Sequence, residues 1–398
     1  MYNFALAFTI CAIFFAIGEL VATITKAWVP SVFVTAVVML LGYWTVIPTT
    51  LVKDSMLIPF GSTIGIFLLI THMGTVVSLK QLGEQWKTIV VCLVGLAGMC
   101  TFSFFVCPLF MDKTFVIAGL PPLTGGIVAA TMMQAAAKSA GLATAAVFAI
   151  TMYCIQGFAG YPITAVCLQK EGKRLLEEYR AGKAQITEED KKLEDAAMAQ
   201  VTPETEARVF PPLPDRFNTP VVILLKLGIV SWFAVLLGKA TGISGAIWAL
   251  VLGIIATRLG FTDRDSLGKA HSTGIIIFAL MMFVFDGLKD CTPAMLSSII
   301  MPMIILIVIG VAGMGIFSFL VAKILKMSPY LAFANALTAL YGFPCDAIIT
   351  ESTCTALAST PEEKEFLMSK MFPSMLVGGF VTVTITSVFI AGVFAKML

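Results

Sequence analysis

The sequence Gly98-Met99-Cys100-Thr101-Phe102-Ser103-Phe104-Phe105-Val106 returns later in the chain as Gly313-Met314-Gly315-Ile316-Phe317-Ser318-Phe319-Leu320-Val321. Each copy lies in a long apolar segment. Each is followed by a hydrophobic stretch that Gly and Pro interrupt, 120–126 in the first half and 341–344 in the second. Internal repetition with broken hydrophobic segments at matching positions is typical of secondary transporters and points to their binding site.

The composition is that of a membrane protein. Of the 398 residues 58% are apolar and 13% are charged, and the mean hydropathy is +0.95. The charged share is about half that of an average soluble protein. The net charge of +2 comes from loops and indicates no nucleic-acid partner. The nine cysteines mostly lie in apolar segments without metal-ligand spacing, so we expect buried thiols, no cofactor and no metal other than a coupling Na+.

Apolar runs near the length of about 20 residues that a helical span needs predict five membrane helices in each half. The first half offers 2–25, 29–47, 56–78, 87–108 and 141–168, with the broken stretch 115–138 before the last. The second half offers 218–239, 242–257, 272–288, 296–322 and 366–395, with the broken stretch 330–357 before the last. If each broken stretch is a re-entrant hairpin, the odd number of spans inverts the second half relative to the first.

The predicted fold class is therefore an all-α polytopic membrane protein with two inverted repeats of five transmembrane helices, each with a re-entrant hairpin. The first repeat takes residues 1–168 and the second takes 218–398. The polar segment 169–217 carries charges of both signs and is predicted to be a solvated helical linker, with partner docking as the alternative.

Loop charges orient the chain. The short loops on one side hold eight basic residues: Lys26, Lys80, Lys87, Arg258, Arg264, Lys269, Lys323 and Lys326. The loops on the other side, together with the C-terminus, hold four: Lys53, Lys113, Lys289 and Lys396. The positive-inside rule then places the linker in the cytoplasm and both termini outside.

The hairpin tips are the first candidate binding site. Pro121-Pro122 followed by Thr124, Gly125 and Gly126 cannot continue a helix, because proline removes amide donors and the paired glycines loosen the backbone. We therefore expect the tip to present free backbone groups inside the membrane. Tyr341, Gly342 and Phe343 do the same in the second half. A proline kink in a complete span is the alternative for either hairpin.

Ionisable and amide side chains near the tips extend this site. Gln134 and Lys138 follow the first tip, and Lys138 either pairs with a substrate carboxylate or reaches the membrane surface. After the second tip, Asp346 and Glu351 either hold a cation or cap helix amides. We expect the neighbouring hydroxyls of Thr350, Ser352 and Thr353 to complete the cation site. Glu19, His72, Lys226 and Asp286, the other ionisable residues in apolar segments, are predicted to be structural.

The chain resembles the bacterial sodium:glutamate symporter family outside the linker. The resemblance lies in Gly65-Ile66-Phe67-Leu68, Leu123-Thr124-Gly125-Gly126, Gly157-Phe158-Ala159-Gly160-Tyr161-Pro162, Phe278-Ala279-Leu280-Met281, Gly342-Phe343, Phe372-Pro373 and Gly378-Gly379-Phe380. That family, which is similar to the 2-hydroxycarboxylate carriers, implies an inner-membrane homodimer with elevator-type motion of a hairpin-bearing domain. The chain departs from the family at the first tip, where the family carries Gly-Gly-His-Gly-Thr-Gly but Gly125-Gly126 is followed by Ile127-Val128-Ala129-Ala130. The coupling ion therefore stays open between Na+ and H+.

The function expected from these features is secondary active transport of a small carboxylate or amino acid by cation symport, without enzymatic activity. An intramembrane hydrolase would need a paired Asp, Ser/His or metal constellation, and the two histidines lie far apart in the sequence. A passive channel would need a polar face through several spans, whereas these segments are polar mainly at the hairpins. The alternatives to a carrier are therefore the channel and the hydrolase.

Overall fold

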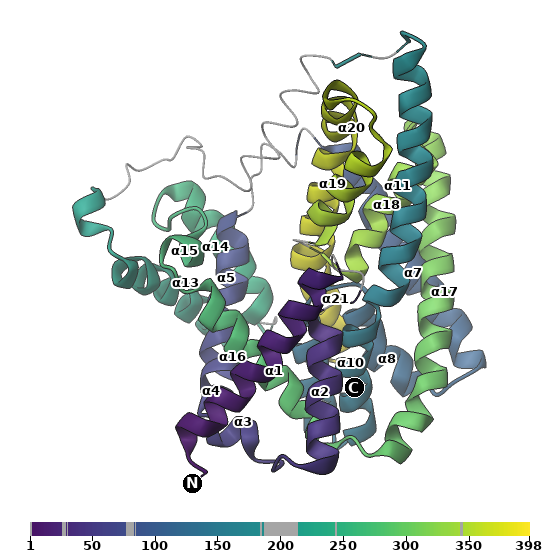
Figure 1. Cartoon of the computed structure of the whole chain (residues 1–398). Helices are drawn as coiled ribbons and strands as arrows, with labels where there is room; N and C mark the ends of the chain where they lie inside the picture. Colours follow the sequence, from purple (N-terminus) through teal and green to yellow (C-terminus); the bar gives the residue numbers. More distant parts are fainter. Residues whose placement is uncertain are drawn as a thin grey trace. The chain divides into compact units, whose positions relative to one another are not determined.

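In the computed structural model, residues 2–25, 29, 31–76, 83, 85–183, 185–186, 214–242, 245–342 and 345–398 are described, and every regular element among them is a helix (Figure 1). Within this part of the chain, seven helices are long and apolar enough to cross a membrane: Phe4–Ile24, Leu57–Val76, Trp86–Leu109, Ala143–Arg180, Pro220–Thr241, Pro293–Leu325 and Pro361–Phe394. The prediction of an all-α, multi-pass membrane protein is confirmed at this level. Inversion of the repeats and elevator motion stay predictions.

The chain divides into two compact units, and each contains segments of both sequence halves. Unit 1 comprises Met1–Glu19, Val34–Ser78 and Thr202–Cys291. Its elements are most of α1 (Phe4–Ile24) and α2 (Ser31–Thr45), then α3 (Leu51–Asp54), α4 (Leu57–Pro59), the π-helix η1 (Phe60–Gly65), α5 (Ile66–Val76), η3 (Asp215–Phe217), α13 (Pro220–Thr241), α14 (Gly245–Leu259), α15 (Ser266–Lys269), α16 (Thr273–Asp286) and η4 (Gly287–Asp290).

Unit 2 comprises Leu20–Phe33, Leu79–Val201 and Thr292–Leu398. From the first half it takes α7 (Trp86–Val106), η2 (Cys107–Leu109), α8 (Lys113–Leu123), α9 (Ile127–Ser139), α10 (Ala143–Ile155) and α11 (Gly157–Arg180). From the second half it takes α17 (Pro293–Leu325), α18 (Pro329–Leu337), η5 (Thr338–Leu340), α19 (Cys345–Leu357), α20 (Pro361–Phe380), the π-helix η6 (Val381–Thr386) and α21 (Ser387–Phe394). Both predicted hairpins, α8–α9 and α18–α19, therefore belong to unit 2.

The order of helices repeats along the chain together with the sequence motif. The first helix of each half starts at Phe4 and at Pro220, and the third apolar segment starts at Leu57 and at Thr273. The residues before the two hairpins, Asp112 and Ser328, are both N-caps and are likewise 216 positions apart. A constant interval from the first helix to the hairpins indicates that the whole half is the repeating element.

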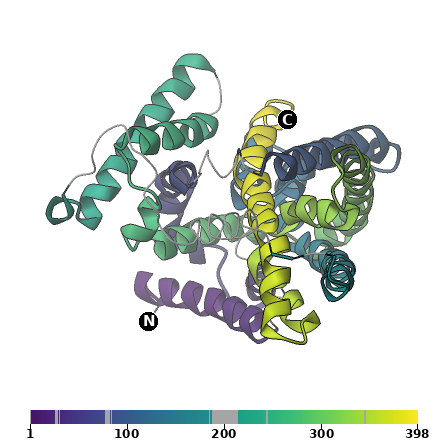
Figure 2. The same ribbon diagram turned by 90° about the horizontal axis from the view of Figure 1, so that it is seen from above.

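The two copies of the repeated motif pack on each other in unit 2, where α7 and α17 lie side by side (Figure 2). The contact is reciprocal. A Cβ built on Gly98 would lie 2.6 Å from the carbonyl oxygen of Gly313, and one built on Gly313 would lie 2.7 Å from the carbonyl oxygen of Gly98. The rings of Phe102 and Phe317 meet edge to face beside this crossing, with centroids 6.2 Å apart. Small residues at matching positions thus let the two backbones touch.

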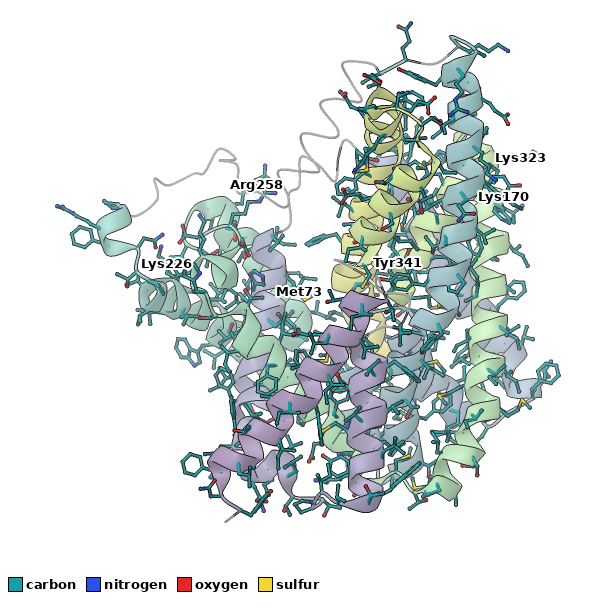
Figure 3. All side chains as sticks on the ribbon, in the orientation of Figure 1. Met73, Lys170, Lys226, Arg258, Lys323 and Tyr341 are labelled. Carbon is teal, nitrogen blue, oxygen red and sulfur yellow. The ribbon has the colours of Figure 1, made fainter. Side chains whose placement is uncertain are left out.

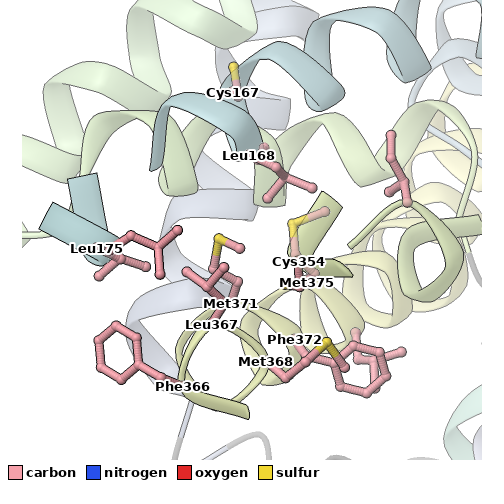
Figure 4. Packing of buried hydrophobic residues seen from close by; sticks show 14 of the residues in the cluster. Cys167, Leu168, Leu175, Cys354, Phe366, Leu367, Met368, Met371, Phe372 and Met375 are labelled. Carbon is pink, nitrogen blue, oxygen red and sulfur yellow. The ribbon is translucent and has the colours of Figure 1, made fainter. Parts of the chain in front are cut away.

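Apolar side chains from four helices, α11, α18, α19 and α20, form one core cluster of unit 2 (Figure 4). Leu168 and Leu175 of α11 meet Cys354 of α19 and Met371 and Met375 of α20, and all five are buried. Helix α11 runs past residue 168, the expected end of the first repeat, and ends at Arg180. Of the predicted linker 169–217, residues 184 and 187–213 lie outside the described residues.

Candidate functional site

Both predicted helix breaks occur in unit 2. Within the first one, Pro121 and Pro122 still belong to the last turn of α8, because the amide of Thr124 donates to the carbonyl of Leu120 at 3.0 Å. Helix α8 ends at Leu123, and the chain turns at Gly125 and Gly126 before α9 begins at Ile127. The glycines therefore make the turn, since a proline lacks only one amide donor and the helical turn around it closes through its neighbours.

Glycine is required at both tips. Gly125 and Gly126 have φ angles of +120° and +86°, and Gly342 in the second tip has a φ of +64°. Residues with a Cβ rarely adopt such backbone, so the turn geometry itself demands these residues. Phe343, the other residue expected at the second tip, lies outside the described residues.

The two tips meet at one turn of the last apolar helix. A Cβ built on Gly342 would lie 2.8 Å from Val383 Cγ2, and one built on Gly126 would lie 2.7 Å from the carbonyl oxygen of Val383. Gly125 lies equally close to the second hairpin, where a Cβ would be 2.7 Å from the carbonyl oxygen of Ala339. Tips from opposite halves of the sequence therefore contact each other and the same residue of η6.

The helix changes its winding at this turn. Val381–Thr386 form a π-helix between α20 and α21. Side-chain hydroxyls bond the carbonyls here: Thr386 Oγ1 donates to Val381 O at 3.0 Å and Thr382 Oγ1 donates to Gly378 O at 2.9 Å. Single-turn π segments inside α-helices occur frequently at functional sites, because they shift backbone carbonyls out of the regular ladder. No pattern in the sequence predicts this π-helix, and the one local signal is a hydroxyl-rich run at 382–387 after the pair Gly378-Gly379.

Buried polar atoms without partners gather in the same unit. Oδ1 of Asp346 accepts the amide of Ala347 at 2.7 Å, whereas Oδ2 packs against Gly379 and has no hydrogen-bond partner among the described residues. The side-chain amides of Gln134 and Asn335 are also buried, and they too have no partner in this part of the chain. Buried polar groups in proteins are almost always hydrogen-bonded, so these atoms are candidate positions for a bound solute, ion or water.

The remaining residues predicted for the substrate differ in their surroundings. Thr124 is buried and its hydroxyl donates to the carbonyl of Pro121 at 2.7 Å. Tyr341 donates its phenolic hydroxyl to Thr164 Oγ1 at 3.0 Å and packs on the ring of Tyr161, 4.8 Å away. Lys138 is exposed in the last turn of α9, one turn beyond buried Gln134. Figure 3 shows Tyr341 inside unit 2.

The predicted cation ligands separate onto two faces of α19. Asp346, Thr350 and Thr353 are buried, whereas Glu351 and Ser352 are exposed. A helix turns by 3.6 residues, so positions four and seven after Asp346 return to its face and position five does not. Glu351 Oε1 pairs with Lys364 Nζ at 3.3 Å on the surface. The expected five-residue ligand set is therefore not brought together.

Helix α11 holds both ends of the second hairpin. At the start of the hairpin, the hydroxyl of Ser328 donates to Glu171 of α11. Glu171 is a buried carboxylate that also pairs with Arg174 at 2.6 Å. After the hairpin, Arg180 Nε and Nη2 bind the two carboxylate oxygens of Glu363 at 2.7 and 2.8 Å. These bidentate and buried contacts, which the sequence did not suggest, fasten the hairpin to α11.

Comparison with known proteins finds likenesses among solved structures. No protein-family model matches the chain, and no curated protein matches it. Among solved structures it is similar to the sodium proton antiporter MjNhaP1 from Methanocaldococcus jannaschii at pH 8, with 15% sequence identity, coverage of 99% of this chain and 97% of that chain, and a TM-score of 0.45. At this score the likeness identifies neither the fold nor the activity.

Proposed function

We propose that this protein is a secondary active transporter that carries a small carboxylate or amino acid by Na+ or H+ symport through alternating access. It would work in a bacterial inner membrane with both termini outside. The observation that carries the proposal is the meeting of two glycine tips, one from each half of the sequence, at the π-helical turn around Val383. Broken helices that meet at the centre of a repeat are the recurring solution for solute and ion sites in transporters.

Chemical roles follow from the groups around the tips. Backbone amides and carbonyls at Gly125, Gly126 and Gly342 would bind the polar ends of the solute. The free amides of Gln134 and Asn335 would supply donors and acceptors for a carboxylate or amino group. Asp346, with one oxygen unpartnered, would hold the coupling cation or proton. Lys138 would contact the solute only when the solute lies near the end of α9.

The division into units suggests which part moves. Unit 2 carries both hairpins, so we assign it as the transport domain. Unit 1, with the first three apolar helices of each half, would form the scaffold and the homodimer contact. The scaffold includes the third apolar segment of each half, because α5 and α16 belong to unit 1.

A channel and a hydrolase are supported less well. Among the described residues, no group of three or more His, Cys, Asp or Glu side chains could hold a metal ion. A carrier differs from a channel in one measurable property. It exchanges internal for external solute faster than it allows net flux, because the loaded site reorients without a gradient.

The test uses one glycine at the tip and a matched glycine elsewhere. Gly342→Ala places a methyl 2.8 Å from Val383 Cγ2 at a φ of +64°. Gly141→Ala introduces similar backbone strain, at a φ of +75°, but nothing lies within 4 Å of its Cβ. Purified parent and variants would be screened by thermal shift against glutamate, aspartate, citrate and malate, with and without Na+, since a ligand of the folded state raises its stability. Proteoliposome counterflow of the best ligand follows.

We expect Gly342→Ala to lose the ligand-dependent shift and the counterflow while it remains folded, and Gly141→Ala to keep both. If Gly342→Ala and Gly141→Ala are equally active, the tip at Gly342 is not part of the solute site. Flux that dissipates a gradient without counterflow in the parent would show a channel. Proton release driven by Na+ in the absence of any organic solute would show ion exchange in place of symport.

A further inference from the structure

A loop of unit 1 contains three consecutive charged residues that are all shielded from solvent or paired. This loop joins α14 to α16 and includes Asp263, Arg264 and Asp265. Asp263 is buried, and its Oδ2 accepts from Lys226 Nζ at 3.2 Å. Lys226 also donates to Asn218 Oδ1 at 3.0 Å. The first acid of the loop is therefore neutralised by a buried lysine of α13.

The second acid has a partner on α5. Nε2 of His72 lies 3.7 Å from Asp265 Oδ1, and Nδ1 of His72 accepts the amide of Leu267 at 3.3 Å. Because Nδ1 is an acceptor, the ring proton resides on Nε2 and points toward the carboxylate. Thr75 Oγ1, one turn further along α5, accepts the amide of Ser266 at 3.4 Å. These bonds fix the loop on the end of α5.

Arg264 stands between these acids without any such partner. Only 8% of the surface of Arg264 is exposed. Nη2 makes no hydrogen bond, and Arg264 forms no ion pair with any of the residues that the structure describes. A guanidinium cannot lose its proton at physiological pH, so Arg264 cannot relieve burial by becoming neutral as a lysine or a carboxyl can. A buried charge of this kind requires an anion.

Other basic residues surround this part of unit 1. Arg258 is exposed in the last turn of α14, and Lys269 is half-buried on α15. Figure 3 shows Lys226 and Arg258 at the same end of the unit. Positive charge at the end of apolar helices is the arrangement that attracts anionic headgroups of the cytoplasmic leaflet.

We propose that Arg264 forms an anion-binding site for a phosphate group, which the headgroup of an anionic phospholipid supplies. The planar guanidinium matches two oxygens of a phosphate, and a diester headgroup keeps its negative charge at all physiological pH values. The apolar chains of the same lipid would lie along the exposed apolar side chains of α14, such as Val251 and Ile255. The site is independent of the proposed solute site, which belongs to unit 2.

The experiment compares Arg264→Gln with Arg258→Gln. Both changes remove one positive charge from the same end of unit 1, but only Arg264 is buried and unpartnered. Delipidated protein in a neutral detergent is titrated with phosphatidylglycerol or with zwitterionic phosphatidylcholine, and thermal unfolding and native mass spectrometry report binding. A third titration replaces chloride by inorganic phosphate at constant ionic strength.

We expect phosphatidylglycerol to raise the unfolding temperature of the parent and of Arg258→Gln more than phosphatidylcholine does. Arg264→Gln should bind phosphatidylglycerol at least about tenfold more weakly, the loss expected when one charge-assisted contact of roughly 1.4 kcal/mol is removed. Without lipid, Arg264→Gln should unfold at the same temperature as the parent or higher, because it removes an uncompensated buried charge.

Two results would overturn the proposal. One is equal lipid affinity and equal lipid-dependent stabilisation in the parent and Arg264→Gln. The other is a lower unfolding temperature of lipid-free Arg264→Gln than of lipid-free Arg258→Gln, which would mean that the protein itself satisfies the guanidinium. If inorganic phosphate reproduces the Arg264-dependent shift and phosphatidylglycerol does not, the site stands with a soluble phosphate as its ligand.

Discussion

The crossing of α7 and α17 allows a quantitative test of the internal repeat. In Gly98→Ala the new methyl would lie 2.6 Å from the carbonyl oxygen of Gly313, and in Gly313→Ala it would lie 2.7 Å from the carbonyl oxygen of Gly98. Carbon and oxygen need about 3.2 Å or more, so the helices must separate by several tenths of an ångström. The obstacle is backbone, which no rotamer change can move aside.

Overpacking of a filled interface costs about 1–3 kcal/mol, and a backbone obstacle places each of these changes toward the upper end, about 2–3 kcal/mol. Gly228→Ala on α13 is the control, because nothing lies within 4 Å of its Cβ. It should be neutral or stabilise by up to about 1 kcal/mol through helix propensity. The double change Gly98→Ala/Gly313→Ala should cost less than the sum of the two, by about 0.5–1.5 kcal/mol, because the first methyl already separates the helices for the second.

Reversible unfolding in mixed detergent micelles, followed by tryptophan fluorescence, gives these free energies. Single variants that unfold like Gly228→Ala would refute the close reciprocal crossing. Fully additive costs would mean that the two glycines act at separate contacts, and the symmetry of the crossing would be lost.

Three further predictions concern single sites. Asp346→Asn should raise the Na+ concentration for half-maximal solute binding about tenfold, or abolish the pH dependence of transport if protons are the coupling ion. Glu351→Gln should leave the ion dependence unchanged, because Glu351 is exposed and paired with Lys364. Identical ion and pH profiles in both variants would contradict a cation role for Asp346. Asp263→Asn should lower the free energy of unfolding by about 3 kcal/mol, because it leaves a lysine buried without its counter-charge. Burial opposes the charge on Asp263, but Lys226 and Asn218 outweigh burial and lower the pKa of this carboxyl. The stabilisation from Asp263 is therefore present above the pKa near 4 of the unfolded chain and is lost as the pH falls further. In acid titrations of stability, Asp263→Asn should lack this pH dependence. A cysteine at position 396 should react with membrane-impermeant maleimide from outside only, and labelling from the cytoplasm would contradict the inverted topology.

The sequence was sufficient for the elements that depend on hydrophobic length and on glycine. Runs of apolar residues gave helices close to the expected bounds, as in 87–108 against Trp86–Val106, because only a helix satisfies backbone polar groups in hydrocarbon. The motif around Gly98 and Gly313 predicts a repeat. The glycines at 125, 126 and 342 indicate the tips, since a positive φ is rare for other residues.

The sequence was insufficient wherever neighbours from distant segments decide the outcome. Pro121 and Pro122 look like a helix end, yet the bonds around them keep the turn closed. Asp346 and Glu351 look like one cation site, yet the packing of α19 buries one and exposes the other. The π-helical turn at Val383 has no sequence rule of its own.

Local sequence properties predict a helical membrane protein with a repeat and two glycine tips, because hydrophobic length and backbone freedom belong to each segment separately. The packing of distant segments brings both tips to Val383, fastens the second hairpin through Glu171 and Arg180, and buries Arg264 without an ion-pair partner among the described residues. These are properties of pairs of residues far apart in the chain. Their energies depend on distance and burial, which exist only once the helices have packed.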